Sequence, residues 1–174
     1  MDNKGFTLVE LLVVIFMITI LSTLVFFDYG SSSKVFELDR TSQKMAQDMR
    51  MMQQKALSGI GGGVDTNGYG LYFSVSDNNY LIYENNNNDP RYDTGDSIIE
   101  TINLSPDVGI ENLKRDNISL GNLSISFFPP GPITYIENYF TNTEGSVTLY
   151  LVDNASEKRV VKINNSGRIE ITRL

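Results

Sequence analysis

The pattern of apolar positions begins with a mainly apolar run from Phe6 to Phe27, in which Glu10 is the only charged residue. A helix rises about 1.5 Å per residue, so this run would reach roughly 33 Å, enough to cross the core of a bilayer. The run therefore predicts a membrane-spanning helix. Glu10 is unexpected there, because a carboxylate at mid-depth in a membrane costs roughly 2.5 kcal/mol or more.

Two further segments continue the helical pattern. Residues 28–33 contain one glycine and three serines, which are poor in helix interiors, so they predict either a soft joint or a short break at the junction with water. Residues 34–57 are amphipathic, with an apolar stripe that should pack on the rest of the chain. The stripe consists of Leu38, Met45, Met49, Met52 and Ala56, and the opposite face carries Glu37, Arg40, Lys44, Gln47, Arg50 and Gln54.

The remainder, residues 58–174, opens with a glycine-rich loop and then alternates apolar and polar residues over short segments. Short alternating segments between turn residues are typical of antiparallel strands. Eight strands are predicted, at residues 69–74, 79–84, 97–104, 108–112, 123–127, 146–152, 158–164 and 167–172. The expected fold is α+β, with a long N-terminal helix packed on an antiparallel β domain of about eight short strands.

The amino-acid composition limits the catalytic and metal-binding chemistry open to the chain. The 174 residues carry a net charge of −7 and include neither cysteine nor histidine. Thiolate or imidazole metal sites, cysteine nucleophiles and histidine-based triads are therefore excluded. No enzymatic activity and no cofactor are expected. The acidic balance argues against a surface that attracts nucleic acid as a whole, although a local basic patch remains compatible with it.

A polar loop and a proline-rich loop interrupt the predicted strands. The polar segment 85–96 offers Asp89, Asp93 and Asp96 as weak candidate ligands for calcium, but their order does not match an EF-hand loop, and no metal is expected. The segment 127–132, which contains three prolines, predicts a rigid exposed loop.

The order Lys4-Gly5-Phe6-Thr7-Leu8-Val9-Glu10-Leu11-Leu12 resembles the cleavage and N-methylation signal of type IV pilins and type II secretion pseudopilins. The resemblance implies that residues 1–5 are a leader, that a prepilin peptidase cuts after Gly5, and that the new amino group of Phe6 is methylated. It also implies that Glu10 pairs with the N-terminal ammonium of a neighbouring subunit. Such pairing would remove the cost of an isolated carboxylate in an apolar setting.

Two simpler interpretations explain less. An ordinary signal peptide has a shorter apolar core and an Ala-x-Ala-like cleavage site, which the chain lacks before Asp28. A plain membrane anchor would leave Glu10 without a role. Lys4 keeps the leader cytoplasmic by the positive-inside rule. The chain is therefore expected to cross the bacterial inner membrane once, with its β domain outside.

The C-terminal half is similar to pseudopilins and minor pilins of the GspH/FimT-like kind. The similar segments are Phe128-Pro129-Pro130-Gly131, residues 147–152, residues 159–163 and Gly167-Arg168-Ile169, together with residues 93–96 and 104–108. This resemblance implies a minor subunit that primes or joins the assembly of a secretion pseudopilus or a type IV pilus. Its implied partners are other major and minor pilins, an inner-membrane platform protein and an assembly ATPase.

An alternative is a DNA-binding minor pilin of a DNA-uptake pilus. Residues 155–174 hold five cations (Lys158, Arg159, Lys162, Arg168 and Arg173) against Glu157 and Glu170, a local excess of 5 − 2 = +3 before the terminal carboxylate. However, Glu170 stands where the DNA-binding pattern would place another arginine. The simpler interpretation is that these are solvent-facing residues alternating on two edge strands.

Overall fold

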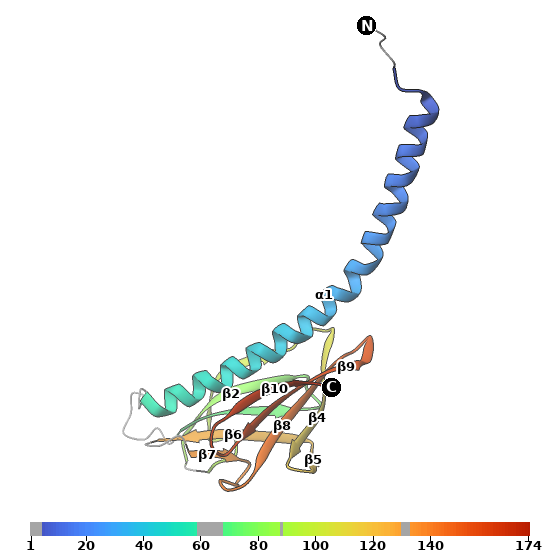
Figure 1. The fold of residues 1–174 in the computed structure, drawn as a ribbon. Coiled ribbons are helices and arrows are strands. Elements are labelled where there is room, and N and C mark those ends of the chain that lie inside the picture. Colours follow the sequence, from blue (N-terminus) through green and yellow to red (C-terminus); the bar gives the residue numbers. More distant parts are fainter. Residues whose placement is uncertain (1–4, 59–67, 88, 130–132) are drawn as a thin grey trace. The chain divides into compact units, whose positions relative to one another are not determined.

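The computed structural model describes residues 5–58, 68–87, 89–129 and 133–174, and leaves out the side chains of residues 24–32. The chain forms two compact units, Met1–Phe36 and Glu37–Leu174. Helix α1 (Leu8–Ser58; Figure 1) contributes to both units, and the described residues that follow it form ten strands. Residues 28–33, where the sequence predicts a soft joint or a short break, are helical.

The first unit is the N-terminal part of α1. Its apolar side chains between Leu8 and Leu21 are 44% to 80% exposed, on every face of the helix. Thr19 and Thr23 satisfy their hydroxyls within the helix by donating to the carbonyls of Ile15 and Thr19 at 2.8 Å each. No helix in the described part of the chain is long and apolar enough to cross a membrane. The predicted span from Phe6 to Phe27 ends among residues whose side chains lie outside the description.

The second unit contains two five-stranded antiparallel sheets. The first has the order β3-β2-β1-β6-β7 and the second β10-β9-β8-β4-β5. The bounds are β1 Gly68–Ser74, β2 Asn79–Asn85, β3 Ser97–Asn103, β4 Val108–Arg115, β5 Ile118–Leu120, β6 Asn122–Phe128, β7 Ile133–Ile136, β8 Glu144–Leu151, β9 Asn154–Asn164 and β10 Ile169–Arg173. The predicted α+β class is confirmed.

The C-terminal half of α1 packs on both sheets. Leu38, Met45, Met49, Met52 and Ala56 are all at most 2% exposed, so the predicted apolar stripe is core. On the first sheet, the Tyr80 hydroxyl of β2 donates to Asp48 of α1 at 2.5 Å. On the second, Arg159 of β9 donates to Asp39 of α1 at 2.5 Å. The helix therefore joins two sheets whose described strands form ladders within each sheet, and side-chain bonds such as that from Asn78 to the Val108 carbonyl add to this link.

The outer face of the first sheet is covered by part of the polar loop. Tyr92 places its ring 4.8 Å from that of Tyr72 and 5.1 Å from that of Tyr83. The Tyr83 hydroxyl lies 2.7 Å from Ser126 Oγ. The Ser126 hydroxyl in turn donates to the Pro90 carbonyl at 2.5 Å. The segment predicted as a simple polar loop thus adds a tyrosine layer to the domain.

The strand count corrects the sequence-based prediction of about eight. Strand β5 was missed because it has three residues between Asp116, which has a positive φ, and Gly121. Strand β7 was missed because its four residues directly follow the proline-rich loop 127–132 and are too few to show a clear alternation. Phe127 and Phe128 of that loop belong to β6, whereas residues 130–132 lie outside the described part of the chain.

Candidate functional site

The N-terminus of α1 is closed by a reciprocal pair of residues, Thr7 and Glu10. Glu10 Oε2 accepts hydrogen bonds from the Thr7 backbone N–H at 2.9 Å and from the Thr7 hydroxyl at 2.8 Å. In return, the Glu10 backbone N–H donates to Thr7 Oγ1 at 3.2 Å. This is a capping box, in which an N-cap threonine and a glutamate three residues later satisfy each other's backbone donors. Glu10 therefore has a local partner as well as the intermolecular one predicted from the sequence.

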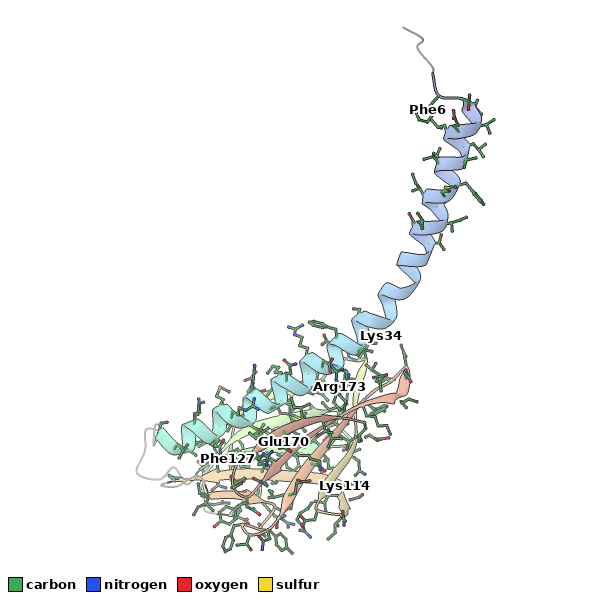
Figure 2. The ribbon with its side chains drawn as sticks, in the orientation of Figure 1. Phe6, Lys34, Lys114, Phe127, Glu170 and Arg173 are labelled. Atoms are coloured by element: carbon green, nitrogen blue, oxygen red, sulfur yellow. The ribbon has the colours of Figure 1, made fainter. Side chains whose placement is uncertain are left out.

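The residues around the predicted cleavage point are open. Phe6 is 83% exposed (Figure 2), and a Cβ added at Gly5 would meet nothing within 4 Å. Gly5 also lies outside the left-handed backbone region that favours glycine. Nothing in the described fold requires a glycine here. A requirement for glycine at position 5 would therefore come from outside the folded chain.

The basic C-terminal hairpin, the second candidate site, is neutralised by carboxylates. All five predicted cations are in ion pairs: Lys158 with Glu111 at 2.6 Å, Arg159 with Asp39 at 2.5 Å, Lys162 with Glu144 at 2.8 Å, Arg173 with Asp39 at 3.0 Å, and Arg168 with Glu170. The cations also divide between two faces. Side chains alternate along a strand, so Arg159 and its cross-strand neighbour Arg173 face α1, while Lys158 and Lys162 face away. The structure does not bring the five together as one basic patch.

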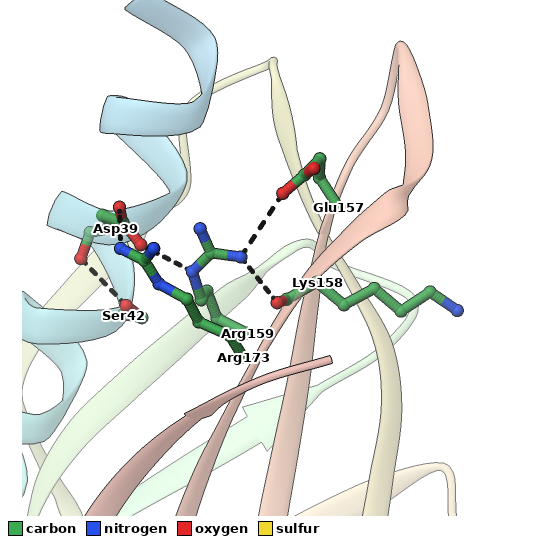
Figure 3. Close-up of polar contacts among 6 residues, drawn as sticks. All are labelled: Asp39, Ser42, Glu157, Lys158, Arg159 and Arg173. Carbon is green, nitrogen blue, oxygen red and sulfur yellow. Dashed lines mark hydrogen bonds and ion pairs between the residues drawn. The ribbon is translucent and has the colours of Figure 1, made fainter. Parts of the chain in front are cut away.

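Asp39 is the centre of the ion-pair cluster at this end of the domain (Figure 3). Its Oδ1 accepts from Arg159 Nε and its Oδ2 from Arg173, so each carboxylate oxygen serves a different strand. Arg159 is 3% exposed and makes two more contacts, to the Lys158 carbonyl at 2.8 Å and to Glu157 at 3.6 Å. A buried guanidinium held this completely is a structural anchor rather than a ligand-binding group.

The aspartates of the polar loop are occupied by the loop itself. Asp96 accepts from the backbone N–H groups of Asn86 at 3.1 Å and Asp93 at 3.0 Å, and Asp93 accepts from Gly95 N–H at 2.6 Å. Burial raises the pKa of the Asp96 carboxyl, against the opposing effect of those hydrogen bonds. Asp89 accepts from the Arg91 N–H at 3.1 Å. Among the described residues, no group of three or more carboxylates is placed to hold a metal ion.

The comparison with protein families concerns the first of the two candidate sites. Residues 1–26 match the model of the prokaryotic N-terminal methylation motif. The chain carries the signal of type IV pilins and pseudopilins. Neither the curated proteins nor the solved structures gave a match to the chain.

The methylation motif places Gly5, Phe6 and Glu10 in one signal and confirms the resemblance predicted from Lys4 to Leu12. It supports a type IV pilin-like or pseudopilin protein, of a structural rather than an enzymatic family, and implies a membrane-anchored precursor. It covers α1 only as far as residue 26, so the GspH/FimT-like assignment stays a prediction.

Sequence reasoning missed two functional features near the methylation motif and the hairpin. The capping box was readable, because a threonine followed three residues later by a glutamate before an apolar run is its signature. The role of Asp39 was not readable, since its partners lie 120 and 134 residues away. Only the folded β9–β10 hairpin brings them together.

Proposed function

We propose that this chain is a minor pilin or pseudopilin that primes or joins the assembly of a type IV pilus or a type II secretion pseudopilus. The observation that carries the proposal is the methylation motif at the head of a helix whose first part, from Leu8 to Leu21, is apolar on every face. A helical segment that is apolar on every face needs an apolar environment. Lipid before assembly, and the helices of other pilins after it, would supply that environment.

The proposed maturation begins at the inner membrane. A prepilin peptidase would remove residues 1–5 on the cytoplasmic side and methylate the amino group of Phe6. The openness of Gly5 and Phe6 supports access by such an enzyme. The β domain would lie outside the membrane, and a platform protein with its assembly ATPase would move the subunit into the filament.

The proposed role of Glu10 is to select correctly staggered neighbours. Its carboxylate already accepts two hydrogen bonds from Thr7, and cleavage would create an ammonium one residue before Thr7. A neighbour whose ammonium meets Glu10 satisfies the charge, whereas a misplaced neighbour leaves it in an apolar setting without a counter-ion. The subunit would thus add to the filament in one register.

The DNA-uptake alternative is not supported by the pairing of its candidate residues. Lys158, Arg159, Lys162, Arg168 and Arg173 would have to exchange their carboxylate partners for phosphates. Affinity for duplex DNA comes chiefly from cations that neutralise phosphates. We therefore keep filament assembly as the proposed function and leave DNA out of it.

The experiment that tests this proposal is expression of the full chain with its prepilin peptidase, followed by intact-mass measurement of the membrane fraction. The wild-type chain should lose residues 1–5 and gain the mass of one methyl group, and Gly5→Ala should keep its full length. Gly121→Ala is the matched control, because a Cβ there also meets nothing within 4 Å. An unprocessed wild-type chain, or a processed Gly5→Ala variant, would contradict the proposal.

A further inference from the structure

An exposed aromatic surface lies at the β7 edge of the first sheet. It consists of Phe128, Tyr135, Tyr139 and Phe140. The Tyr135 ring lies 5.2 Å from that of Phe128 and 5.6 Å from that of Phe140, which makes a continuous line of three rings. Tyr139 is 49% exposed and Phe140 57%. Phe128 and Tyr135 are half-buried. Exposed apolar patches that are large for a soluble domain mark binding surfaces.

The turn that carries these rings is held firmly. Tyr139 exchanges backbone hydrogen bonds with Ile136, at 3.1 Å as donor and 2.9 Å as acceptor. The Asn165 side chain donates to the Tyr139 carbonyl at 3.1 Å, and the Arg115 guanidinium lies 4.1 Å from the centre of the Tyr139 ring. The exposed rings therefore do not result from a loose loop. A rigid platform loses little conformational entropy when a ligand binds.

A polar pocket of about 300 Å³ has Asn142, two residues after Phe140, in its lining. It lies where turns of both sheets meet and is lined chiefly by Asp116, Asn142, Glu144, Asn164 and Asn165. Asn165 bonds to Tyr139, and Asp116 follows Arg115 in the chain, so the pocket and the aromatic surface share their supports. Its volume is at the lower end of the range of small-molecule sites.

The pocket keeps hydrogen-bonding capacity after its internal bonds are made. Asp116 uses Oδ1 to accept from the Glu144 N–H at 2.8 Å, and Glu144 uses Oε1 for Lys162 at 2.8 Å. A carboxylate has two oxygens with about four acceptor positions in all, so each side chain retains acceptors for a ligand hydroxyl. Asn164 Oδ1 already accepts hydrogen bonds within the turn 164–168. The side-chain N–H groups of Asn164 therefore remain as donors toward a ligand.

The aromatic surface and the polar pocket together favour a particular class of ligand. An apolar protein side chain would need an apolar pocket, and this one is lined by carboxylates, amides and hydroxyls. A sugar ring presents C–H groups on one face, which pack on an aromatic ring, and a dense set of hydroxyls at its edge. None of the described residues that line the pocket is a lysine or arginine, and although Glu144 is paired with Lys162, an anionic sugar would meet the negative charge of Asp116.

We propose that the aromatic surface and the polar pocket together bind a neutral or N-acetylated oligosaccharide. One sugar ring stacks on Phe140, and the hydroxyls of the adjoining ring bond to Asp116, Glu144 and the pocket amides. The site belongs to the second compact unit, whereas the methylation motif belongs to the first, and it goes beyond the assembly function proposed above. Such a site would let a subunit contact a glycan outside the membrane.

The test uses the purified full chain in a zwitterionic detergent without sugar headgroups, because alkyl glycosides would compete. It is applied to a panel of immobilised glycans that includes cellohexaose, chitohexaose and polygalacturonate, and the strongest soluble binder is then titrated by calorimetry. We expect retention of a neutral or N-acetylated glycan and none of polygalacturonate. Phe140→Ala and Phe140→Leu should raise Kd by about tenfold or more, because leucine keeps the apolar area but not the ring.

Three further variants make the result specific. Phe140→Tyr should keep wild-type affinity, because it restores a ring. Asp116→Asn should weaken binding while its side-chain oxygen still accepts from the Glu144 N–H. Ile118→Ala, at an apolar residue 53% exposed on the other sheet, should change nothing. Retention of no glycan, retention of polygalacturonate alone, or unchanged affinity in Phe140→Leu would each overturn the proposal.

Discussion

Asp39 and Arg159 are 120 residues apart in sequence, and Arg159 Nε donates to Asp39 Oδ1 at 2.5 Å (Figure 3). Asp39 is the third residue of the second compact unit, and its other oxygen accepts from Arg173 at 3.0 Å. One carboxylate on α1 thus ties down both strands of the C-terminal hairpin.

The first prediction concerns that carboxylate. Asp39→Ala removes the partner of an arginine that is 3% exposed, which leaves a buried charge poorly compensated. Breaking a buried pair from one side costs about 3 kcal/mol, so the free energy of unfolding should fall by roughly that amount. Thermal and urea unfolding followed by circular dichroism measure it.

Glu170→Ala is the control for this prediction. It also removes one carboxylate from an arginine, but the partner Arg168 is 72% exposed, and exposed pairs contribute about 0–1 kcal/mol. The two variants change formal charge equally, so a difference between them reports burial. Equal stability of Asp39→Ala and Glu170→Ala would show that Asp39 is not an anchor.

The same ion pairs show what sequence patterns can and cannot provide. Alternation located eight of the ten strands, and spacing located the buried stripe from Leu38 to Ala56, because both depend on neighbours in the chain. The excess of +3 in residues 155–174 was counted against Glu157 and Glu170 alone. The structure adds Asp39, Glu111 and Glu144 from other elements. Tertiary pairing of this kind leaves no local signal in the sequence, so an excess of basic residues in one segment does not establish a basic surface.

The tyrosine layer leads to a second prediction, at Gly70. In the register of β1 and β2, Gly70 lies opposite Tyr83, and a Cβ on Gly70 would collide with the Tyr83 ring. The ring is fully buried and its hydroxyl contacts Ser126, so it has little room to move. Gly70→Ala should therefore lower the free energy of unfolding by about 1–3 kcal/mol, as overpacking does.

Gly121→Ala serves as the comparison, since the added Cβ meets nothing within 4 Å. It controls for the general effect of replacing glycine by alanine, including the reduced entropy of the unfolded chain. Urea unfolding of the two variants side by side measures the difference. If Gly70→Ala is as stable as Gly121→Ala, the close approach between Gly70 and Tyr83 is not a constraint.

A third prediction concerns alkaline pH. Burial raises the pKa of the Tyr80 hydroxyl, and its hydrogen bond to Asp48 adds to the effect. Burial also raises the pKa of Tyr83, against a smaller opposing effect of its hydrogen bond with Ser126. Both groups hold their protons more tightly in the folded chain. Their contribution to stability is therefore full below the unfolded tyrosine pKa of about 10 and is lost as pH rises above it.

We expect the free energy of unfolding to fall from about pH 10 upward, as measured by urea unfolding at fixed pH values. Tyr80→Phe should lower stability at neutral pH, because it removes a hydrogen bond to a carboxylate, but should flatten the alkaline decline. The tyrosine absorbance near 295 nm provides a second readout, with Tyr80 and Tyr83 titrating only as the chain unfolds. An alkaline decline as steep in Tyr80→Phe as in the wild type would contradict the assignment.

The last prediction separates the two roles of Glu10, as cap of α1 and as proposed partner of a neighbour's ammonium. Glu10→Gln keeps an oxygen that can accept from Thr7, because glutamine also serves at this position of a capping box, but it loses the charge. Glu10→Ala loses both. Thr7→Val removes the hydroxyl that caps the helix, at a cost of about 1 kcal/mol, and keeps the carboxylate. All three should still be cleaved and inserted, since Gly5 is unchanged.

If pairing with the ammonium drives assembly, Glu10→Gln and Glu10→Ala should both be absent from sheared filaments, and Thr7→Val should be incorporated. If capping is what matters, Glu10→Gln should be incorporated and Thr7→Val should be depleted, and immunoblots of sheared and membrane fractions distinguish these two patterns.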